Sequence, residues 1–325
     1  MSLLTNKQTI IPSKFDDPVV KPSETESIKP VAMEKGLEFF QGQFTIRVAN
    51  RLRLRQKAYG LLYELYSKMG ITQNEGDGLW LSIYDALPET TTFVAEDDRG
   101  CSVGALTVVF DSPIGLPADE LYEKEIDILR KTGVKICEFV SLGIKDERKS
   151  SLKVLAGLFY CAFLHAWQRE NSTILIITVH SRYENFYRRK LFFEKMGPER
   201  NYAKVNGAPT VLLNLSLAKI SRLRHNHRIF PFIMLNYTEQ EELDFAQKIE
   251  NMTCPMSDEE FFSFFIEKTD IWEKASPRQK NLVKAIYPPY KVNHHEVSRA
   301  LAKGFSKKYR FSNEAENNTS KIAKR

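Results

Sequence analysis

One carboxylate stands out because the residues on either side of it are apolar. Glu138 lies in ICEFVSLGI (136–144), a stretch with the composition of a central β-strand. A carboxylate in such a strand costs free energy unless it is hydrogen-bonded or paired. Burial also raises the pKa of a carboxyl group toward the range of a useful general base. Glu138 is therefore a candidate for proton transfer or amine binding. The alternative is a structural carboxylate bonded to an arginine.

A tyrosine follows a second apolar stretch. STILIITV (172–179) is almost wholly apolar and predicts another central strand, and NFYRRKLFF then opens a helix that contains Tyr187. A tyrosine hydroxyl has an ordinary pKa of about 10, so it holds a proton at neutral pH and can donate it. The alternative is a packed aromatic ring whose hydroxyl is hydrogen-bonded.

The remaining pattern predicts an α/β fold. Strands and helices alternate along the chain, and a β-hairpin turns at Asp97-Asp98-Arg99-Gly100. A mixed sheet with helices on both faces is the natural packing for this order. The predicted strands at 134–144 and 172–179 are joined by a long helix at 150–170. A right-handed crossover should make these two strands parallel neighbours.

The chain divides by composition. Residues 1–38 are rich in Pro, Ser, Thr and charge and predict a flexible arm, whereas 39–222 carries the alternating strands and helices. After it the strand pattern ends, and 223–310 predicts a helical C-terminal extension in which Ser257 and Ser276 are candidate N-caps. Residues 311–325 predict a disordered tail.

Net charge, cysteine spacing and the length of the apolar runs exclude several classes of protein. The 325 residues carry a formal net charge of +6, which is too small to imply a nucleic-acid partner. The four cysteines show no paired spacing and the histidines lack a third ligand, so we expect neither disulfides nor a metal site. The longest apolar run, 154–167, falls short of the roughly 20 residues that span a bilayer. We expect a cytoplasmic protein, with peripheral membrane contact left open.

Several segments in order resemble a known family. The run TTTFVAED…GALTVVFDSPIGLPADELY…EIDILR…CEFVSLGI, followed by NFYRRKLFF, resembles the N-acyl amino acid synthases. That family is similar to the acyl-homoserine lactone synthases and to the GNAT N-acetyltransferases. The resemblance covers about 44–217. It implies a GNAT N-acetyltransferase-like mixed central sheet flanked by helices, to which this chain adds its α-helical C-terminal extension.

The resemblance also implies roles. Glu138 matches a glutamate of these families, and Tyr187 matches the tyrosine that protonates the leaving thiolate in many acetyltransferases. Arg55 and Asp85 stand where the lactone synthases hold an arginine and an aspartate near the acceptor, so they would bind its carboxylate and ammonium. Ser141 replaces an arginine of the lactone synthases and is a further acceptor-side candidate. Surface charges are the alternative for Arg55 and Asp85.

The acyl donor is inferred from a loop in which this sequence differs from the acetyltransferases. Acetyl-coenzyme A enzymes of this fold use a Gly-rich pyrophosphate loop, but KDERKSS (145–151) contains no glycine. An acyl-phosphopantetheine arm of an acyl carrier protein fits better, and acyl-coenzyme A stays open. In the resembling fold two helix starts lie side by side and would bind an acidic carrier. Their basic residues are Lys145, Arg148, Lys149, Arg188 and Arg189.

These expectations combine into one function. The chain is expected to join a long-chain acyl group, delivered as a carrier thioester, to the amine of an amino acid or a similar small acceptor, with no tightly bound cofactor. Two alternatives stay open: a coenzyme-A-dependent acetyltransferase of a small amine, and a catalytically silent acyltransferase-like module that docks a partner.

Overall fold

The computed structural model describes most of residues 39–222 and part of residues 223–310. The described residues are 38–41, 44–71, 78–145, 151–170, 174–219, 240, 243, 247 and 253–287. Residues 1–37 of the predicted arm (1–38) and the predicted tail at 311–325 lie outside them, as do Arg148 and Lys149. The predicted boundaries at 222 and 310 also fall outside and stay predictions.

In the described part of the chain, nine strands form one sheet in the order β1-β2-β3-β4-β5-β6-β9-β7, with β8 also paired to β9. The strands are β1 (Glu38–Gln41), β2 (Phe44–Val48), β3 (Thr91–Asp97), β4 (Ser102–Phe110), β5 (Ile136–Ile144), β6 (Ile174–His180), β7 (Glu194–Lys195), β8 (Arg200–Tyr202) and β9 (Ala208–Ser216). Every pair is antiparallel except β5–β6, which is parallel.

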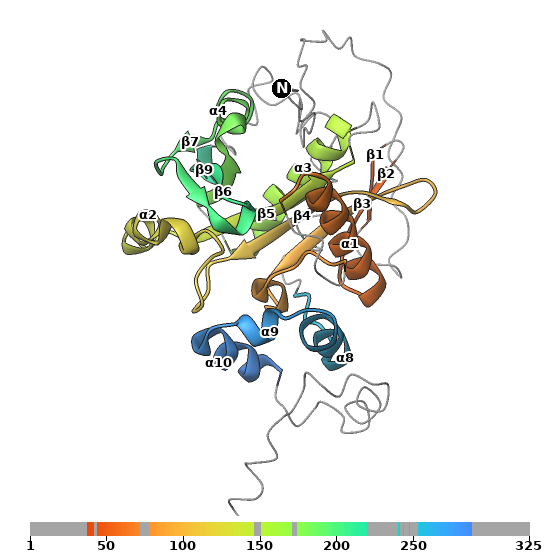
Figure 1. Cartoon of the computed structure of the whole chain (residues 1–325). Helices are drawn as coiled ribbons and strands as arrows, with labels where there is room; N and C mark the ends of the chain where they lie inside the picture. Colours follow the sequence, from red (N-terminus) through yellow and green to blue (C-terminus); the bar gives the residue numbers. More distant parts are fainter. Residues whose placement is uncertain are drawn as a thin grey trace, which may run out of the picture.

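Helices cover both faces of the sheet (Figure 1). The helices of the sheet domain are α1 (Leu52–Lys68), α2 (Asp119–Lys131), α3 (Ser151–Glu170) and α4 (Glu184–Leu191), with short turns η2 (Ile83–Ala86), η3 (Ser181–Tyr183) and η4 (Ala203–Val205). Alternate residues of β5 separate the faces, since Cys137 and Phe139 pack with α3 whereas Ile136 packs with α2. Helix α1 and the turn η2 build a third apolar cluster.

Two glycines let helices approach neighbouring strands closely. A Cβ atom on Gly104 of β4 would lie 2.7 Å from a methyl carbon of Val154 in α3. A Cβ atom on Gly143 of β5 would lie 2.9 Å from side-chain carbons of both Leu62 and Leu65 in α1. A larger residue at either place would therefore push a helix away from the sheet.

Strands β5 and β6 pair over a short distance only. Their register joins Ile136 to Ile174, Cys137 to Leu175 and Glu138 to Ile176, and there the pairing stops. Both strands continue, β5 to Ile144 and β6 to His180. We name the three paired positions the seam. Beyond the seam, the edge of β5 that faces β6 has no strand partner among the described residues.

The C-terminal helices pack against α1 and η2 and extend the same core. They are α8 (Asp258–Phe261), the π-helical turn η5 (Phe262–Glu267), α9 (Ile271–Lys274) and α10 (Pro277–Ile286). Phe264 and Phe265 are fully buried in the cluster that contains Tyr59 of α1. In Figure 1 these blue helices lie together on the opposite side of the molecule from α4.

The GNAT-like mixed sheet flanked by helices, with C-terminal helices, is confirmed, as are the parallel seam and the 97–100 turn. Ser257 and Ser276 cap α8 and α10 through capping boxes, as the sequence predicts. The sequence prediction missed three short strands: β1, β7 and β8. No helix among the described residues is both long enough and apolar enough to cross a membrane.

Candidate functional site

Glu138 occupies the last paired position of the seam, where β5 and β6 diverge. Its side chain is 2% exposed, and its Oε2 accepts a hydrogen bond of 2.8 Å from the backbone N–H of Ala118. Burial raises the pKa of Glu138 to about 8, although the Ala118 N–H and the charge of Lys204 oppose that rise. A carboxyl group with this pKa can accept and return a proton near neutral pH.

Two tyrosines reach the segment that contacts Glu138. The Tyr84 hydroxyl, from η2, donates to the carbonyl of Leu116 at 3.1 Å. The Tyr202 hydroxyl, from β8, donates to Oε2 of Glu120 at 2.9 Å. Burial raises the pKa of both tyrosines, and the nearby charge of Glu138 raises them further. Both phenols therefore stay protonated at neutral pH, and strands and turns distant in sequence converge on residues 116–120.

Asp85, next to Tyr84 in η2, is a second buried carboxylate. Its Oδ2 accepts from the backbone N–H and the hydroxyl of Ser82, at 2.7 and 3.0 Å. The Tyr59 hydroxyl also hydrogen-bonds to it. Burial raises the pKa of Asp85, and the charge of Lys204 lowers it. Lys204 thus acts on both carboxylates of the site.

Lys204 lies in η4, the turn between β8 and β9. Its neighbour Asn206 donates through Nδ2 to the carbonyl of Gly70 at the end of α1, so this turn reaches across to the first helix. Within the described part of the chain the Lys204 side chain makes no ion pair or hydrogen bond. The exposed ammonium is therefore a candidate for binding an anionic group of a ligand near Glu138.

A bulge follows Glu138 along β5. The pairing with β4 shifts register between Ala105 and Thr107, and Ser141 has a left-handed φ of 54°. The Ser141 hydroxyl accepts from the indole N–H of Trp80 at 3.2 Å, so this predicted acceptor-side residue contacts the chain itself. Such bulges often occur beside active sites, where they redirect side chains.

Tyr187 is buried among aromatic rings on the opposite face. Its ring packs edge-on against Phe186 and Phe193, with centroids 5.4 and 5.7 Å away. Burial raises its pKa, so the hydroxyl is protonated at neutral pH. Tyr187 lies near enough to Tyr66 to raise the pKa of Tyr66, whose hydroxyl donates to the Leu142 carbonyl in the bulge at 3.0 Å. Tyr187 and the diverging part of β5 are thus neighbours.

Arg55, in α1, faces the C-terminal segment, and its charge also acts on Tyr59, a residue that interacts with Asp85. Its guanidinium is 2% exposed and pairs with Glu260 at 2.5 Å. It also donates to the carbonyl of Cys254 at 2.7 Å and to that of Pro255 at 3.3 Å. Because these groups belong to the C-terminal segment, we propose a structural role for Arg55 in place of the expected contact with an acceptor.

The predicted carrier-binding residues are partly described. Lys145 lies 3.3 Å from Glu64, and Arg188 lies 3.1 Å from Glu184 on its own helix. Arg189 is exposed and makes no ion pair within the described residues. Lys145 and Arg188 are half-exposed, so a partner could still compete for them.

The structure brings together some of the predicted residues and adds others. Glu138, Ser141 and Tyr187 lie around the point where β5 and β6 diverge. Asp85 is linked to Glu138 because the charge of Lys204 acts on both carboxylates. Sequence reasoning missed Tyr84, Tyr202 and Lys204. No spacing signal connects them, because β8 and the turn after it bring Tyr202 and Lys204 to the site, whereas Tyr84 comes from η2.

A family match agrees with this arrangement. Residues 57–216 match the family model described as N-acyl amino acid synthase FeeM. The match starts in α1 and ends with β9, so it includes Glu138, Asp85, Tyr187 and Lys204. It confirms the family inferred from the sequence. The C-terminal helices lie outside the match. No curated protein sequence matches the chain.

Solved structures with similar folds include three synthases. FeeM, an N-acyl amino acid synthase from uncultured soil microbes, is 23% identical, covering 55% of this chain and 92% of its own, with a TM-score of 0.49. The AHL synthase LasI is 16% identical over 54% of this chain and 91% of its own (TM-score 0.43). The CoA-dependent acyl-homoserine lactone synthase BjaI, solved with SAM and isopentyl-CoA, is 11% identical over 62% and 97% (TM-score 0.41).

Proposed function

Because residues 57–216 belong to the FeeM family of N-acyl amino acid synthases, we propose that this acyltransferase moves a long-chain acyl group from a carrier-protein thioester to the amine of an amino acid. The observation that carries the proposal is the position of Glu138, a buried carboxyl with a pKa of about 8 where β5 and β6 diverge. A base with this pKa suits an ammonium acceptor.

In the proposed reaction two side chains transfer protons. Glu138 accepts a proton from the acceptor ammonium, directly or through a water, and frees the amine lone pair. The amine attacks the thioester carbonyl, so a C–N bond forms and the C–S bond breaks. The thiolate takes a proton from the Tyr187 hydroxyl. The proton left on the new amide nitrogen and the proton held by Glu138 depart to solvent, and Tyr187 is reprotonated from solvent.

We place the acyl arm along the free edge of β5. Beyond the seam this edge has no strand partner within the described residues, so its backbone groups can hydrogen-bond an extended arm. Bound there, the arm would bring its thioester between Glu138 and Tyr187, which lie on opposite faces of the sheet. The carrier itself would contact the basic residues Lys145, Arg148, Lys149, Arg188 and Arg189.

We assign the acceptor side to the groups around residues 116–120. Glu138 and Asp85 attract an ammonium, and Lys204 lies within electrostatic reach of both. An α-amino acid carries both charges on one small molecule, so it can satisfy Lys204 and the carboxylates together. Lys204 thus takes the carboxylate-binding role that the resemblance implied for Arg55. We place the reaction in the cytoplasm, where the four free thiols stay reduced.

The direct test is product identification. The purified full chain is incubated with an acyl carrier protein loaded with a long acyl group and a mixture of the amino acids, and products are analysed by mass spectrometry. Parallel reactions use acyl-coenzyme A and acetyl-coenzyme A. We expect N-acyl amino acids from the carrier thioester and almost none from the Glu138→Gln variant, which keeps the shape of the side chain. Equal product from a folded Glu138→Gln variant, or only acetylated amines, would refute the proposal.

A further inference from the structure

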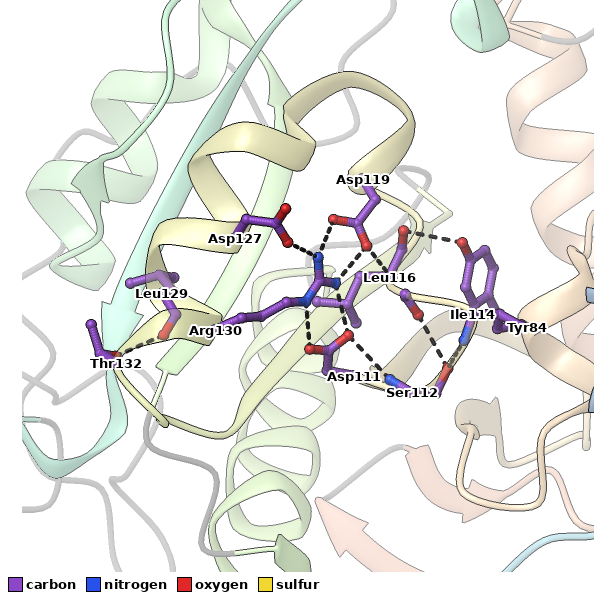
Figure 2. Close-up of polar contacts among 11 residues, drawn as sticks. Tyr84, Asp111, Ser112, Ile114, Leu116, Asp119, Asp127, Leu129, Arg130 and Thr132 are labelled. Atoms are coloured by element: carbon purple, nitrogen blue, oxygen red, sulfur yellow. Dashed lines mark hydrogen bonds and ion pairs between the residues drawn. The ribbon is translucent and has the colours of Figure 1, made fainter. Parts of the chain in front are cut away.

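An arginine outside the proposed reaction centre uses every N–H donor on carboxylates (Figure 2). Arg130, in the last turn of α2, binds Asp111 through Nε and Nη2, both at 2.8 Å. It binds Asp119 through Nη1 at 2.8 Å and Nη2 at 2.6 Å, and its other Nη1 proton goes to Asp127 at 2.9 Å. Two contacts are bidentate, which is the strongest and most directional arginine–carboxylate geometry. We name these four residues the Arg130 clasp.

The clasp ties both ends of one connection to a single point. Asp111 directly follows β4, and Asp119 is the first residue of α2. Asp119 also accepts the backbone N–H of Leu116 at 2.7 Å, which folds the connection 111–118 back on itself. Gly115 has φ 79°, and a Cβ atom there would collide with the Asp119 carboxylate. The connection is therefore held in one compact shape.

This connection is also the part of the chain that contacts Glu138. Its residue Ala118 provides the N–H that hydrogen-bonds Glu138, and its residue Leu116 accepts from Tyr84. A continuous path of short contacts thus runs from Arg130 through Asp119 to the cover of Glu138. Arg130 itself is not among the charges that act on Glu138, which are Lys204 and Asp119.

We propose that Arg130 is a positioning residue for the general base: the clasp holds connection 111–118 against Glu138, keeps water away from the carboxyl and orients it through the Ala118 N–H. This inference rests on the proposed function for its catalytic meaning. The effect of Arg130 on the environment of the Glu138 carboxyl does not depend on that function. Without the clasp the connection would loosen, water would reach Glu138, and the carboxyl would behave more like an ordinary one.

A neighbouring arginine supplies a matched control. Arg200 of β8 also binds α2 by a bidentate pair, to Glu125 at 2.6 and 3.0 Å, and it donates to the Leu121 carbonyl at 2.6 Å. The exposed fractions of the two arginine side chains are similar, 26% for Arg130 and 32% for Arg200. Arg200 helps to dock α2 but contacts no residue of connection 111–118. Losing it should weaken the helix contact without uncovering Glu138.

The experiment titrates the carboxyl group itself. The ¹³C carboxyl resonance of Glu138, assigned by its loss in Glu138→Gln, is followed with pH in the full-length protein. Lys204, Asp119, Tyr84 and Tyr202 face this group and are not substituted in any variant. Loss of Arg130 leaves the Asp119 charge unpaired, which alone would raise the midpoint, and we expect the entry of water to outweigh it. We expect a midpoint near 8 in the parent protein, as the burial of Glu138 implies, and in Arg200→Gln. Arg130→Gln should lower the midpoint by at least one pH unit, and Arg130→Lys, which cannot form the fork, should lower it less.

Turnover gives a second readout. A displacement of about 1 Å can reduce a rate roughly 10²-fold, so kcat should fall by about that factor in Arg130→Gln and by much less in Arg200→Gln. If Arg130→Gln does not fold, Arg130→Lys carries the test. Equal midpoints in the Arg130 and Arg200 variants would overturn the inference. An Arg130-dependent midpoint in a protein that makes no amide would support the positioning role and refute the proposed function, so the two can fail separately.

Discussion

Glu138 combines a charged group with an environment that disfavours charge. Its side chain is 2% exposed, and among the described residues its carboxyl has one hydrogen bond, from the Ala118 N–H. Desolvation favours the protonated form, so folding is coupled to proton binding at this residue. A base tuned in this way makes the folded state less stable whenever it is ionised.

That coupling predicts how stability depends on pH. The pKa of Glu138 is about 8 in the folded chain and near 4.5, the ordinary value, in the unfolded chain. Between these values the folded state binds the extra proton, so the free energy of unfolding should fall as pH rises from about 4.5 to 8 and then level off. Each unit of pKa corresponds to about 1.4 kcal/mol. Glu138→Gln removes this effect. In urea unfolding, the free energy of unfolding of the variant, relative to that of the parent, should therefore increase by several kcal/mol between pH 5 and pH 9. A constant difference would contradict the raised pKa.

If Lys204 binds the acceptor carboxylate, the enzyme should discriminate between an amino acid and the amine that lacks its carboxylate. Lys204→Gln should raise the KM for the preferred amino acid about tenfold, the scale of one charge-assisted hydrogen bond, and leave the KM for the decarboxylated amine unchanged. The comparison needs only steady-state kinetics with the two acceptors. Lys219→Gln is the control, because Lys219 pairs with Glu194 on an exposed surface. Equal losses with both acceptors would remove Lys204 from carboxylate binding.

The sequence predicts some of these residues and not others, for a physical reason. Glu138 is visible because its own neighbours in the chain are apolar, which is local information. The role proposed here for Arg55 is not visible, because its partner Glu260 lies 205 residues away in a segment outside the family match. Tyr84 and Tyr202 likewise have no special local context. Their importance arises only where η2 and β8 meet residues 116–120.

At the scale of elements, the divergence of β5 and β6 separates two tasks. One face of β5 carries Glu138 toward the acceptor groups, and the other face carries Phe139 toward α3 and the aromatic rings around Tyr187. The sequence predicts this division from strand alternation and predicts the parallel pair from the crossover helix. It does not predict β7 or β8, because two or three residues are too few to show alternation.

The basic start of α4 predicts a salt-dependent encounter with the carrier. Arg189→Glu should lower kcat/KM for the acyl-carrier thioester about tenfold at low salt and flatten its dependence on ionic strength. The rate with a free acyl-pantetheine thioester should not change, because this donor lacks the acidic carrier. Arg278→Glu is the control, because Arg278 is exposed on α10, far along the chain from the predicted carrier-binding residues. Unchanged rates with the carrier thioester at every salt concentration would place the docking surface elsewhere.

At the scale of the whole molecule, the C-terminal helices are part of the core. Tyr287 donates to the carbonyl of Ala86 in η2 at 2.9 Å, and the Cys254 N–H donates to the carbonyl of Pro88 at 2.8 Å. The turn that carries Asp85 is therefore supported from behind by residues outside the family match. A chain cut after β9 would expose apolar surface of α1 and η2.

Substitution of Arg55 tests the contact between α1 and the C-terminal segment. Removing one partner of a buried ion pair leaves the other charge unpaired, so Arg55→Ala should lower the free energy of unfolding by about 3–5 kcal/mol in urea titrations. The control is the double variant Arg55→Met with Glu260→Met, which replaces both charges with apolar groups of similar size. It should lose much less, about 1 kcal/mol, because it leaves no buried charge unpaired and gives up hydrogen bonds alone, among them the capping-box bond that Glu260 accepts from the Ser257 N–H. An equal loss in the double variant would show that packing, and not the unpaired charge, explains the effect.

The three-position seam also has a consequence for the order in which the chain folds. Strands β1 to β5 pair antiparallel with their neighbours in sequence, and β6 pairs with β9, whereas the seam forms only after α3 has closed a long crossover. Contacts distant in sequence carry a loop-closure entropy that delays them. The two halves of the sheet should therefore form first and join last. In stopped-flow measurements, Leu175→Ala in the seam should mainly accelerate unfolding, whereas Val108→Ala in β4 should also slow folding.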